Sequence, residues 1–259
     1  MEEQKIEKIV MIGAGRLAWH LASALQKQGL EIIQVFNRTP ARGRRLAGRT
    51  GASYTGNIRD INLSADLYIM AVSDEALAVL AAELRLADRL VVHTSGSMAL
   101  DILAPVSKIT GVFYPLQTFA HASRISFKQI PVCIEATSSD AEHQLHQLAL
   151  RLTRTVCILD SEKRRMLHLG AVFVSNFTNH LYGVAEELLG SRNIPFSMLE
   201  PLIRQTAANA SRGNIFTLQT GPAVRGDLRV LENHYELLAG YPGYLEIYKT
   251  ISAGIIKKK

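Results

Sequence analysis

A glycine-containing turn near the N-terminus constrains this chain more than any other feature. The segment KIVMIGAGRLAWHLASAL places Gly13, Gly15 and Ala18 between an apolar strand-like stretch and a helical pattern. In a dinucleotide-binding βαβ unit, the first glycine permits the tight turn, the second lets the backbone approach a pyrophosphate, and the third small residue keeps the helix close to the sheet. The alternative is a glycine-rich turn that binds nothing. The predicted cofactor-binding residues of this turn are Gly13, Ala14, Gly15, Arg16, Leu17 and Ala18.

The end of the second predicted strand indicates which dinucleotide is preferred. An NAD site usually places Asp or Glu about 20 residues after the glycines, where it binds the ribose 2′-hydroxyl. This chain has Asn37, Arg38 and Thr39 there instead. Asn37 is neutral, Arg38 can bind a 2′-phosphate, and Thr39 can donate a hydrogen bond to it. The sequence therefore predicts NADP in preference to NAD, with these three residues in the cofactor site.

Short strand-like stretches alternate with helical patterns over the first 158 residues. Each stretch is rich in Val and Ile and is bounded by Gly, Ser, Asp or Pro, which is typical of buried strands. Such alternation indicates βαβ units with right-handed crossovers, as in a doubly wound, parallel, Rossmann-type sheet of the α/β class. The expected strands are 8–12, 31–36, 66–71, 89–93, 111–114, 131–135 and 155–158, and the early ones are separated by helices over 14–28 and 74–84.

The strand pattern stops after Asp160. Asp160 or Ser161 can cap a long helix over 162–189, and Gly190 ends it. Further helices are expected over 197–211, 227–239 and 244–255. We therefore expect a Rossmann-type dinucleotide-binding domain over residues 1–158 and an all-α domain over residues 159–259.

Two other strand ends carry small and polar residues. Ligands of open α/β sheets lie beyond the carboxyl ends of the strands. Ala71, Val72 and Ser73 follow one predicted strand, and we expect them to flank the cofactor. The segment HTSGS follows another, and Ser95 within it can approach a nicotinamide or a substrate. Ordinary turn hydrogen bonding or a helix cap is the alternative for both segments.

The composition excludes several classes of protein. A chain with 47% hydrophobic and 20% charged residues is globular rather than disordered. No apolar stretch approaches the roughly 20 residues of a membrane helix, and the charged N-terminus is unlike a secretory signal. Cys133 and Cys157 lack the spacing of a metal site, and no nucleic-acid-binding motif accompanies the net charge of +6. We expect a cytoplasmic protein without metal, nucleic-acid or membrane partners.

Longer motifs resemble known families. GAGRLAWHLASAL, FNRT and AVSD resemble the superfamily of 6-phosphogluconate dehydrogenases, β-hydroxyacid dehydrogenases, pyrroline-carboxylate reductases and deazaflavin-linked NADP reductases. HTSG, YPLQTF, HLGAVFVSNF and TGPAVRGD together resemble an uncharacterised bacterial family that joins a Rossmann-like domain to a helical domain of unknown function. This resemblance covers nearly the whole chain. It implies the two-domain fold, NADP binding, and dimerisation through a helical domain related to the C-terminal domain of 6-phosphogluconate dehydrogenase.

Two positions depart from the patterns of these families. The β-hydroxyacid dehydrogenases carry a catalytic lysine one helical turn before an asparagine. If Asn176 is that asparagine, Val172 occupies the lysine position. The bacterial family also tends to have histidine before Pro-Leu-Gln, where this chain has Tyr114. Both departures argue against the usual hydroxyacid chemistry.

His168 is the nearest replacement for the missing lysine. On a regular helix, Ser175, Asn179 and Tyr182 would lie within about 40° of it, forming a polar stripe. Such a stripe can line a cleft between the two domains and carry protons, or it can face solvent. The predicted catalytic residues are His168, Asn176 and Ser95.

The segment from Gly221 to Asp227 has two interpretations. Arg225 can bind an anionic substrate, or the segment simply turns the chain into a helix that Asp227 caps.

Two functions from different classes remain open. The first is an NADP-dependent oxidoreductase that acts on a small molecule and forms a homodimer through its helical domain, with hydride transfer in an interdomain cleft. The second is a dinucleotide-binding regulatory or scaffold protein without catalytic activity, which the absence of the lysine favours.

Overall fold

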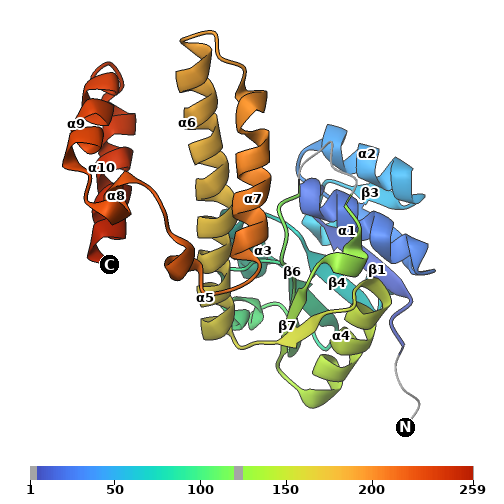
Figure 1. Ribbon diagram of the computed structural model, residues 1–259. Coiled ribbons are helices and arrows are strands. Elements are labelled where there is room, and N and C mark those ends of the chain that lie inside the picture. The colour runs from blue at the N-terminus through green and yellow to red at the C-terminus, as the bar shows by residue number, and fades with distance from the viewer. Residues whose placement is uncertain (1–4, 120–124, 259) are drawn as a thin grey trace. The chain divides into compact units, whose positions relative to one another are not determined.

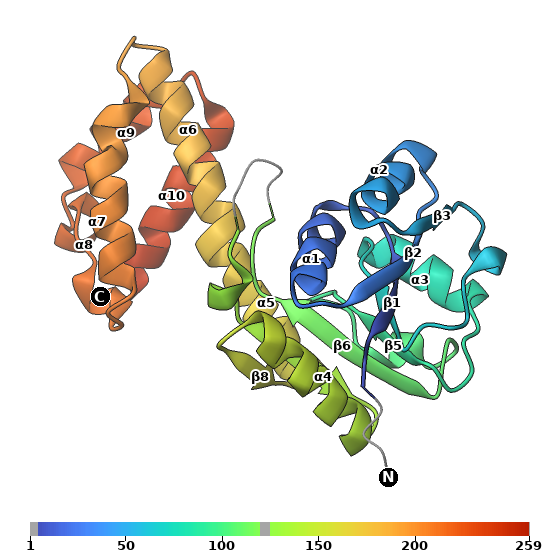
Figure 2. The same cartoon turned by 90° about the vertical axis from the view of Figure 1, so that its right-hand side faces the viewer.

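The computed structural model describes residues 5–119 and 125–258. They form two compact units, divided between Ser175 and Asn176 (Figures 1 and 2). The first unit contains a β-sheet and the helices that cover it, and the second is helical. This confirms the predicted fold class of a Rossmann-type α/β sheet followed by a helical region.

The described residues of the first unit form one eight-stranded sheet in the order β3-β2-β1-β4-β5-β6-β7-β8. All neighbouring pairs from β3 to β6 are parallel. The chain proceeds from β1 to β2 on one side and returns to β4 on the other, so the switch point of the doubly wound sheet lies between β1 and β4. The strands are β1 (Lys8–Ile12), β2 (Glu31–Phe36), β3 (Ser53–Thr55), β4 (Leu67–Met70), β5 (Leu90–His93), β6 (Ile109–Pro115), β7 (Val132–Ala136) and β8 (Val156–Ile158).

Helices cover both faces of this sheet because its strands are apolar on both sides. In β1, Ile9 and Met11 pack into one core cluster, whereas Val10 and Ile12 pack into the other. The first cluster includes buried side chains from α1 (Arg16–Lys27), α2 (Pro40–Thr50) and α4 (Ser139–Leu152). The second includes those of α3 (Asp74–Glu83) and the 3₁₀ helix η2 (Leu100–Leu103).

The sheet departs from the prediction at β7, which runs antiparallel to β6. A parallel return needs a long crossover, which is usually a helix. The described part of the β6–β7 connection contains only the 3₁₀ turn η3 (Phe127–Gln129). The strand β3, which has three residues and pairs only with β2 in the described residues, was not predicted at all.

The predicted long helix over 162–189 is interrupted by a π-helical segment. It consists of α5 (Ser161–Ala171), the π segment η4 (Val172–Phe177) and α6 (Thr178–Gly190). Asp160 caps α5 as expected, because its side chain accepts a hydrogen bond from Lys163 N at 2.8 Å. A π turn closes i→i+5 bonds and shifts the helical phase. The polar stripe predicted from His168 to Tyr182 assumed a regular 100° per residue. The π segment breaks this regularity, so the predicted angles do not apply beyond Val172.

Helix α5 is fixed to the sheet by Arg164, whose side chain is buried. Its guanidinium forms an ion pair with Glu135 on β7 and donates to the Met98 carbonyl. Ser161 Oγ donates to Glu135 Oε2 at 2.9 Å and accepts from Leu100 N at 3.0 Å. Removing one partner of a buried ion pair typically costs about 3–5 kcal/mol. These contacts explain why the first compact unit includes α5.

The second unit buries few side chains of its own. Among its described residues, only Ala223, Leu231, Leu238 and Ser252 are buried. Its helices are α6, α7 (Glu200–Ala210), α8 (Pro222–Arg225), α9 (Leu228–Leu237) and α10 (Pro242–Lys257), with 3₁₀ turns η5 (Phe196–Leu199) and η6 (Ile215–Leu218). Across the described ranges, no helix is both long and apolar enough to span a membrane.

The segment from Gly221 to Asp227 forms a turn between helices. Gly221 and Gly226 have φ values of 110° and 71°, which favour glycine. They flank α8, and Asp227 caps α9 by accepting a hydrogen bond from Val230 N at 3.3 Å. The segment therefore turns the chain into a helix that Asp227 caps, as one of the two interpretations predicted.

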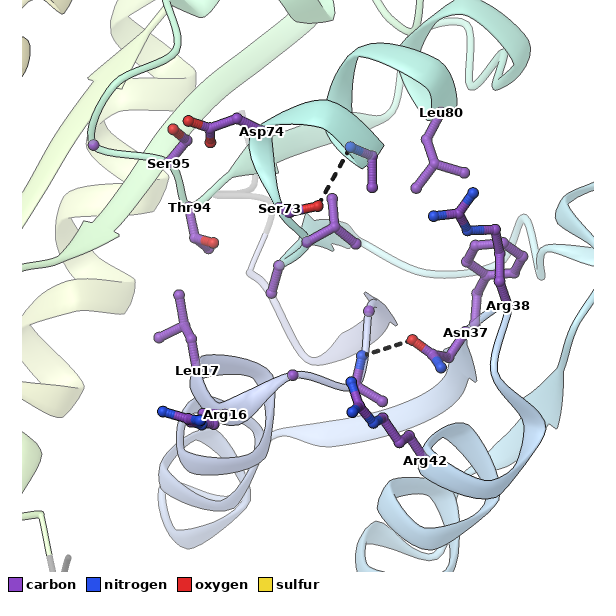
Figure 3. A pocket seen from close by; sticks show the side chains of 18 of the residues that line it. Arg16, Leu17, Asn37, Arg38, Arg42, Ser73, Asp74, Leu80, Thr94 and Ser95 are labelled. Atoms are coloured by element: carbon purple, nitrogen blue, oxygen red, sulfur yellow. Dashed lines mark hydrogen bonds between the residues drawn. The ribbon is translucent and has the colours of Figure 1, made fainter. Parts of the chain in front are cut away.

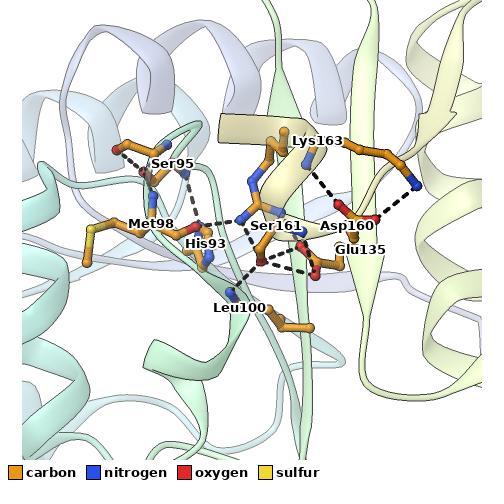
Figure 4. Close-up of polar contacts among 10 residues, drawn as sticks. His93, Ser95, Met98, Leu100, Glu135, Asp160, Ser161 and Lys163 are labelled. Carbon is orange, nitrogen blue, oxygen red and sulfur yellow. Dashed lines mark hydrogen bonds and ion pairs between the residues drawn. The ribbon is translucent and has the colours of Figure 1, made fainter. Parts of the chain in front are cut away.

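His93 lies beside the Arg164 network at the end of β5 and is fully buried (Figure 4). Its Nδ1 accepts a hydrogen bond from Ser95 N at 3.1 Å, which requires an unprotonated Nδ1. Burial, and then the nearby positive charge of Arg164, lower the pKa of His93 to about 4. The folded protein therefore holds this ring neutral.

We expect the free energy of unfolding to fall as the pH is lowered from about 6.5 to about 4. In this window the unfolded chain protonates His93 and the folded chain does not, because its folded pKa is about 4. The loss between pH 8 and pH 5 should be about 2 kcal/mol, measured by urea denaturation. His93→Asn, which keeps an acceptor for Ser95 N, should remove this contribution. An identical pH slope in the variant would contradict the prediction.

Candidate functional site

One pocket of about 560 Å³ lies at the carboxyl ends of β1 and β4, at the switch point of the sheet (Figure 3). The residues that line it all belong to the first unit. They are Gly13, Ala14, Gly15, Arg16, Leu17, Phe36, Asn37, Arg38, Thr39, Arg42, Ala71, Val72, Ser73, Asp74, Ala76, Leu80, Thr94, Ser95, Gly96, Ser97, Tyr114 and His168.

The glycine turn forms one wall of this pocket. Gly13 has φ +111°, and a Cβ there would lie 2.3 Å from the Ala71 carbonyl oxygen, so the turn can pass over β4 only with glycine. A Cβ at Gly15 would meet no atom within 4 Å. Gly15 begins α1, whose first turn carries no acidic side chain. The turn therefore offers open space and a positive helix end, which suit an anionic group.

Asn37 holds the glycine turn against the loop that follows β2. Its side chain accepts from Ala14 N at 3.1 Å and donates to the Thr39 carbonyl at 2.8 Å (Figure 3). Tyr54 donates its hydroxyl proton to the Asn37 carbonyl at 3.1 Å. Asn37 thus uses both ends of its amide to set the shape of the pocket.

Charge is unevenly distributed along the pocket. Arg38 and Arg42 lie at one end, and Asp74, Thr94 and Ser95 lie at the other (Figure 3). Thr39 begins α2 without a capping hydrogen bond from its hydroxyl, which leaves that hydroxyl available. Two guanidinium groups, a hydroxyl and a helix N-terminus form a suitable environment for a phosphate.

Local turns occupy the serine hydroxyls at the other end. Ser73 Oγ accepts from Ala76 N at 3.4 Å and caps α3. Ser95 Oγ accepts from Ser97 N at 3.1 Å and Met98 N at 3.0 Å. Ser97 donates its hydroxyl proton to Asp74. The predicted alternatives of turn and cap chemistry therefore hold for Ser73 and Ser95, although both residues also line the pocket.

His168 reaches the same end of the pocket from α5. Its Nδ1 lies 3.0 Å from the hydroxyl oxygen of Tyr114, the penultimate residue of β6. The two rings meet edge to face, with centroids 5.9 Å apart. Burial raises the pKa of Tyr114 to about 12, so its hydroxyl stays protonated at neutral pH. This arrangement places a histidine–tyrosine pair at the end of the pocket opposite Arg38 and Arg42.

The structure brings most of the predicted site residues into one pocket lining. Ser95 and His168 lie there with the glycine turn, the loop after β2 and the loop after β4. Ala18 instead is fully buried in the core, where it packs α1 against the sheet. Asn176 begins the second unit, and its role stays a prediction.

Sequence reasoning did not assign several residues of the lining. Arg42 lies in the first turn of α2, so its closeness in sequence to Arg38 and Thr39 could have found it. Asp74 and Ser97 follow predicted strands, but their contact with each other depends on the tertiary fold. The sequence signal at Tyr114 was limited to its departure from the bacterial family, which tends to have histidine there.

Comparisons with known proteins agree with this architecture. Residues 2–118 match the model of a Rossmann-like domain, and residues 130–255 match a domain of unknown function, DUF2520. No curated protein matches the chain.

Solved structures resemble the chain over nearly its whole length. A candidate NADP oxidoreductase from Bacteroides fragilis is 41% identical, with a TM-score of 0.91 over 97% of this chain and 98% of that one. The imine reductase from Myxococcus stipitatus in complex with NADP⁺ is 16% identical, with a TM-score of 0.66 over 96% and 94%. A pyrroline-5-carboxylate reductase from Streptococcus pyogenes is 14% identical, with a TM-score of 0.62 over 96% and 98%. The last two show a shared fold. The chain therefore belongs to the family of proteins that join an N-terminal Rossmann-like domain to a C-terminal DUF2520 domain.

Proposed function

We propose that this protein binds NADP and is an oxidoreductase that transfers hydride between the cofactor and a small molecule. The observation that carries this proposal is the composition of a single pocket. Its lining contains a glycine turn and two arginines that suit phosphates, together with a histidine–tyrosine pair that suits proton transfer. The Bacteroides fragilis relative, described as a candidate NADP oxidoreductase, supports the same interpretation.

The residues of the pocket fit a dinucleotide. The open side of Gly15 and the N-terminus of α1 would hold the pyrophosphate. Arg38, Thr39 and Arg42 would hold the adenosine 2′-phosphate, and no carboxylate occupies the end of β2 to favour a 2′-hydroxyl. When bound, a reduced nicotinamide supplies a hydride ion.

The other end of the pocket would hold the reacting part of the substrate. Reduction of a carbonyl or an imine also requires a proton for the heteroatom, and histidine is the most frequent general acid. His168 and Ser95 are the proposed catalytic residues at this end, where both line the pocket. Asn176 is the third proposed catalytic residue, on the basis of the sequence alone.

A non-catalytic dinucleotide-binding regulator or scaffold is the second candidate. It is favoured by Val172, which stands at the position that the resemblance assigns to a catalytic lysine. Titration with NADPH, followed by a screen of small oxo acids, imines and aldehydes for NADPH oxidation, separates the two candidates. Binding without any turnover would favour the regulator.

We predict that NADPH binds at least about tenfold more tightly than NADH, equivalent to roughly 1.4 kcal/mol. Arg38→Ala should remove most of this difference, because it deletes a guanidinium placed for the 2′-phosphate. Arg154→Ala, an exposed substitution outside the pocket lining, is the matched control and should preserve the preference. Isothermal titration calorimetry measures both affinities. Equal affinities in the unmodified protein would refute the assignment.

We expect His168→Ala to reduce turnover by a factor of about 10² or more, the usual scale for loss of a general acid. The dissociation constant of NADPH should change by less than about threefold, because the phosphate-binding residues lie at the other end of the pocket. Steady-state kinetics and calorimetry provide the two values. Unchanged turnover with a bound, oxidisable substrate would exclude His168 as the acid.

We also propose a homodimer formed through the second unit. Its helices bury few side chains and expose large apolar ones, including Met198, Leu202 and Phe216, each more than 60% exposed. An apolar surface of this kind indicates an interface, and a symmetric dimer is the commonest way to cover it. Light scattering at micromolar concentration should give twice the chain mass of 28.6 kDa. A single-chain mass at that concentration would contradict the proposal.

A further inference from the structure

The side chain of Tyr54 contacts the loop before α2 from outside the pocket. Tyr54 is the central residue of the short strand β3 and is partly buried, but it does not line the pocket. Its hydroxyl donates to the Asn37 carbonyl oxygen at 3.1 Å. A carbonyl oxygen can only accept, so the direction of this hydrogen bond is fixed. Tyr54 therefore acts on the pocket through Asn37, which is one of its lining residues.

Two glycines leave the space in which the Tyr54 ring lies. A Cβ at Gly43, within α2, would lie 2.3 Å from Tyr54 Cε2 and 3.0 Å from Asn37 Cβ. A Cβ at Gly56 would lie 2.9 Å from the Tyr54 hydroxyl oxygen. The guanidinium of Arg44 lies over the ring, 5.0 Å from its centroid. Contacts from α2 and from the residue after β3 therefore keep the hydroxyl beside the Asn37 carbonyl.

The residues that follow Asn37 are those proposed for the adenosine 2′-phosphate. Asn37 Nδ2 donates to the Thr39 carbonyl at 2.8 Å, and Gly43 N donates to the same carbonyl at 3.1 Å. Arg38, between Asn37 and Thr39, is exposed. A loop that already has its bound conformation loses less entropy when a ligand binds. Holding the Asn37 carbonyl therefore favours phosphate binding by Arg38.

The glycine turn is held by separate hydrogen bonds. Gly13 N donates to the Phe36 carbonyl at 2.8 Å, and Ala14 N donates to Asn37 Oδ1 at 3.1 Å. Neither of these bonds involves the Tyr54 hydroxyl. Loss of that hydroxyl should therefore leave the turn that is proposed for the pyrophosphate in place.

We propose that Tyr54 is a positioning residue for the 2′-phosphate of NADP. By holding the Asn37 carbonyl, it keeps Arg38 and Thr39 in place for that phosphate, and so contributes to the selection of NADP over NAD. This inference rests on the proposed NADP binding.

Calorimetric titration of Tyr54→Phe with NADPH and with NADH tests this role. Phenylalanine keeps the ring and removes only the hydrogen bond to Asn37. We expect the dissociation constant of NADPH to rise about fivefold, the scale of one lost neutral hydrogen bond. That of NADH should change less than about twofold, because NADH has no 2′-phosphate and its pyrophosphate uses the glycine turn. An unchanged ratio of the two constants would overturn the proposal.

Tyr68→Phe is the matched control for a purely structural effect. The Tyr68 hydroxyl donates to the Asn62 carbonyl at 2.9 Å, and its ring belongs to the core cluster on the other face of the sheet. Both variants lose the same kind of hydrogen bond, and thermal unfolding shows whether each is folded at the titration temperature. Tyr68→Phe should keep the ratio of the dissociation constants of NADPH and NADH. An equal change of this ratio in both variants would overturn the proposal.

Two glycine variants in α2 test the same contact by steric means. Gly43→Ala should weaken NADPH binding about fivefold or more, because the added methyl group displaces the Tyr54 ring or the helix. Gly48→Ala, where a Cβ would meet no atom within 4 Å, should leave NADPH binding unchanged. Alanine favours a helix more than glycine does, so a loss in Gly43→Ala comes from the clash. Equal NADPH affinities of the two variants would contradict the assigned role.

A double variant tests whether Tyr54 acts through Arg38. In an Arg38→Ala background, Tyr54→Phe should weaken NADPH binding less than about twofold, because the guanidinium that it positions is absent. The full fivefold effect in that background would show that the two side chains act independently, and would overturn the proposal.

Amide hydrogen exchange separates this inference from the proposed cofactor preference. In the free protein, Tyr54→Phe should speed exchange in residues 37–43 at least about threefold and leave residues 13–18 unchanged, since local opening sets the exchange rate. Unchanged exchange in residues 37–43 would overturn the positioning role. Equal affinities of the unmodified protein for NADPH and NADH would refute the cofactor preference, whereas the exchange measurement would still decide whether Tyr54 holds the loop.

Discussion

The buried guanidinium of Arg164 is the interaction on which the candidate site depends most. A fully buried charge is tolerated only when it is paired and hydrogen-bonded, and Glu135, Ser161 and the Met98 carbonyl provide those partners. These partners come from β7, the start of α5 and the loop after β5. One guanidinium group, through its ion pair and hydrogen bonds, thus fixes the helix, the sheet and the loop relative to one another. His168, one turn further along α5, reaches the pocket because of this arrangement.

The pocket combines two environments that a redox site with a phosphorylated cofactor would need. At one end, Arg38 and Arg42 supply positive charge, and the N-termini of α1 and α2 add partial positive charge. At the other end, the groups are short hydroxyls, a carboxylate and the histidine–tyrosine pair. The proposed phosphate-binding end is therefore separate from the proposed proton-transfer end. A substitution at one end can alter cofactor affinity without altering proton transfer. The proposals for cofactor binding and for catalysis can therefore be tested independently.

Local sequence signals predicted much of the fold and one side of the pocket. The turn at Gly13 and the caps at Asp160 and Asp227 depend on neighbouring residues, so their patterns are visible in the sequence. The antiparallel β7 and the π segment after Ala171 were missed because tertiary packing decides them. The contact of Tyr114 with His168, on the other side of the pocket, was missed for the same reason. It depends on a helix that Arg164 anchors to the sheet.

The Tyr114–His168 contact also bears on whether catalysis survives without the family lysine. On a regular helix, residues four apart lie on one face, so His168 lies one turn before Val172, the position assigned to that lysine. A proton-transfer group can therefore move by one turn and stay on the same side of the helix. A scaffold that only binds a dinucleotide has no need for a histidine held at hydrogen-bond distance from a buried tyrosine. Gly96 leaves room for both rings, because a Cβ there would lie 2.6 Å from His168 Nδ1 and 2.8 Å from Tyr114 Cζ. The contact therefore favours a working acid–base pair over an inert remnant.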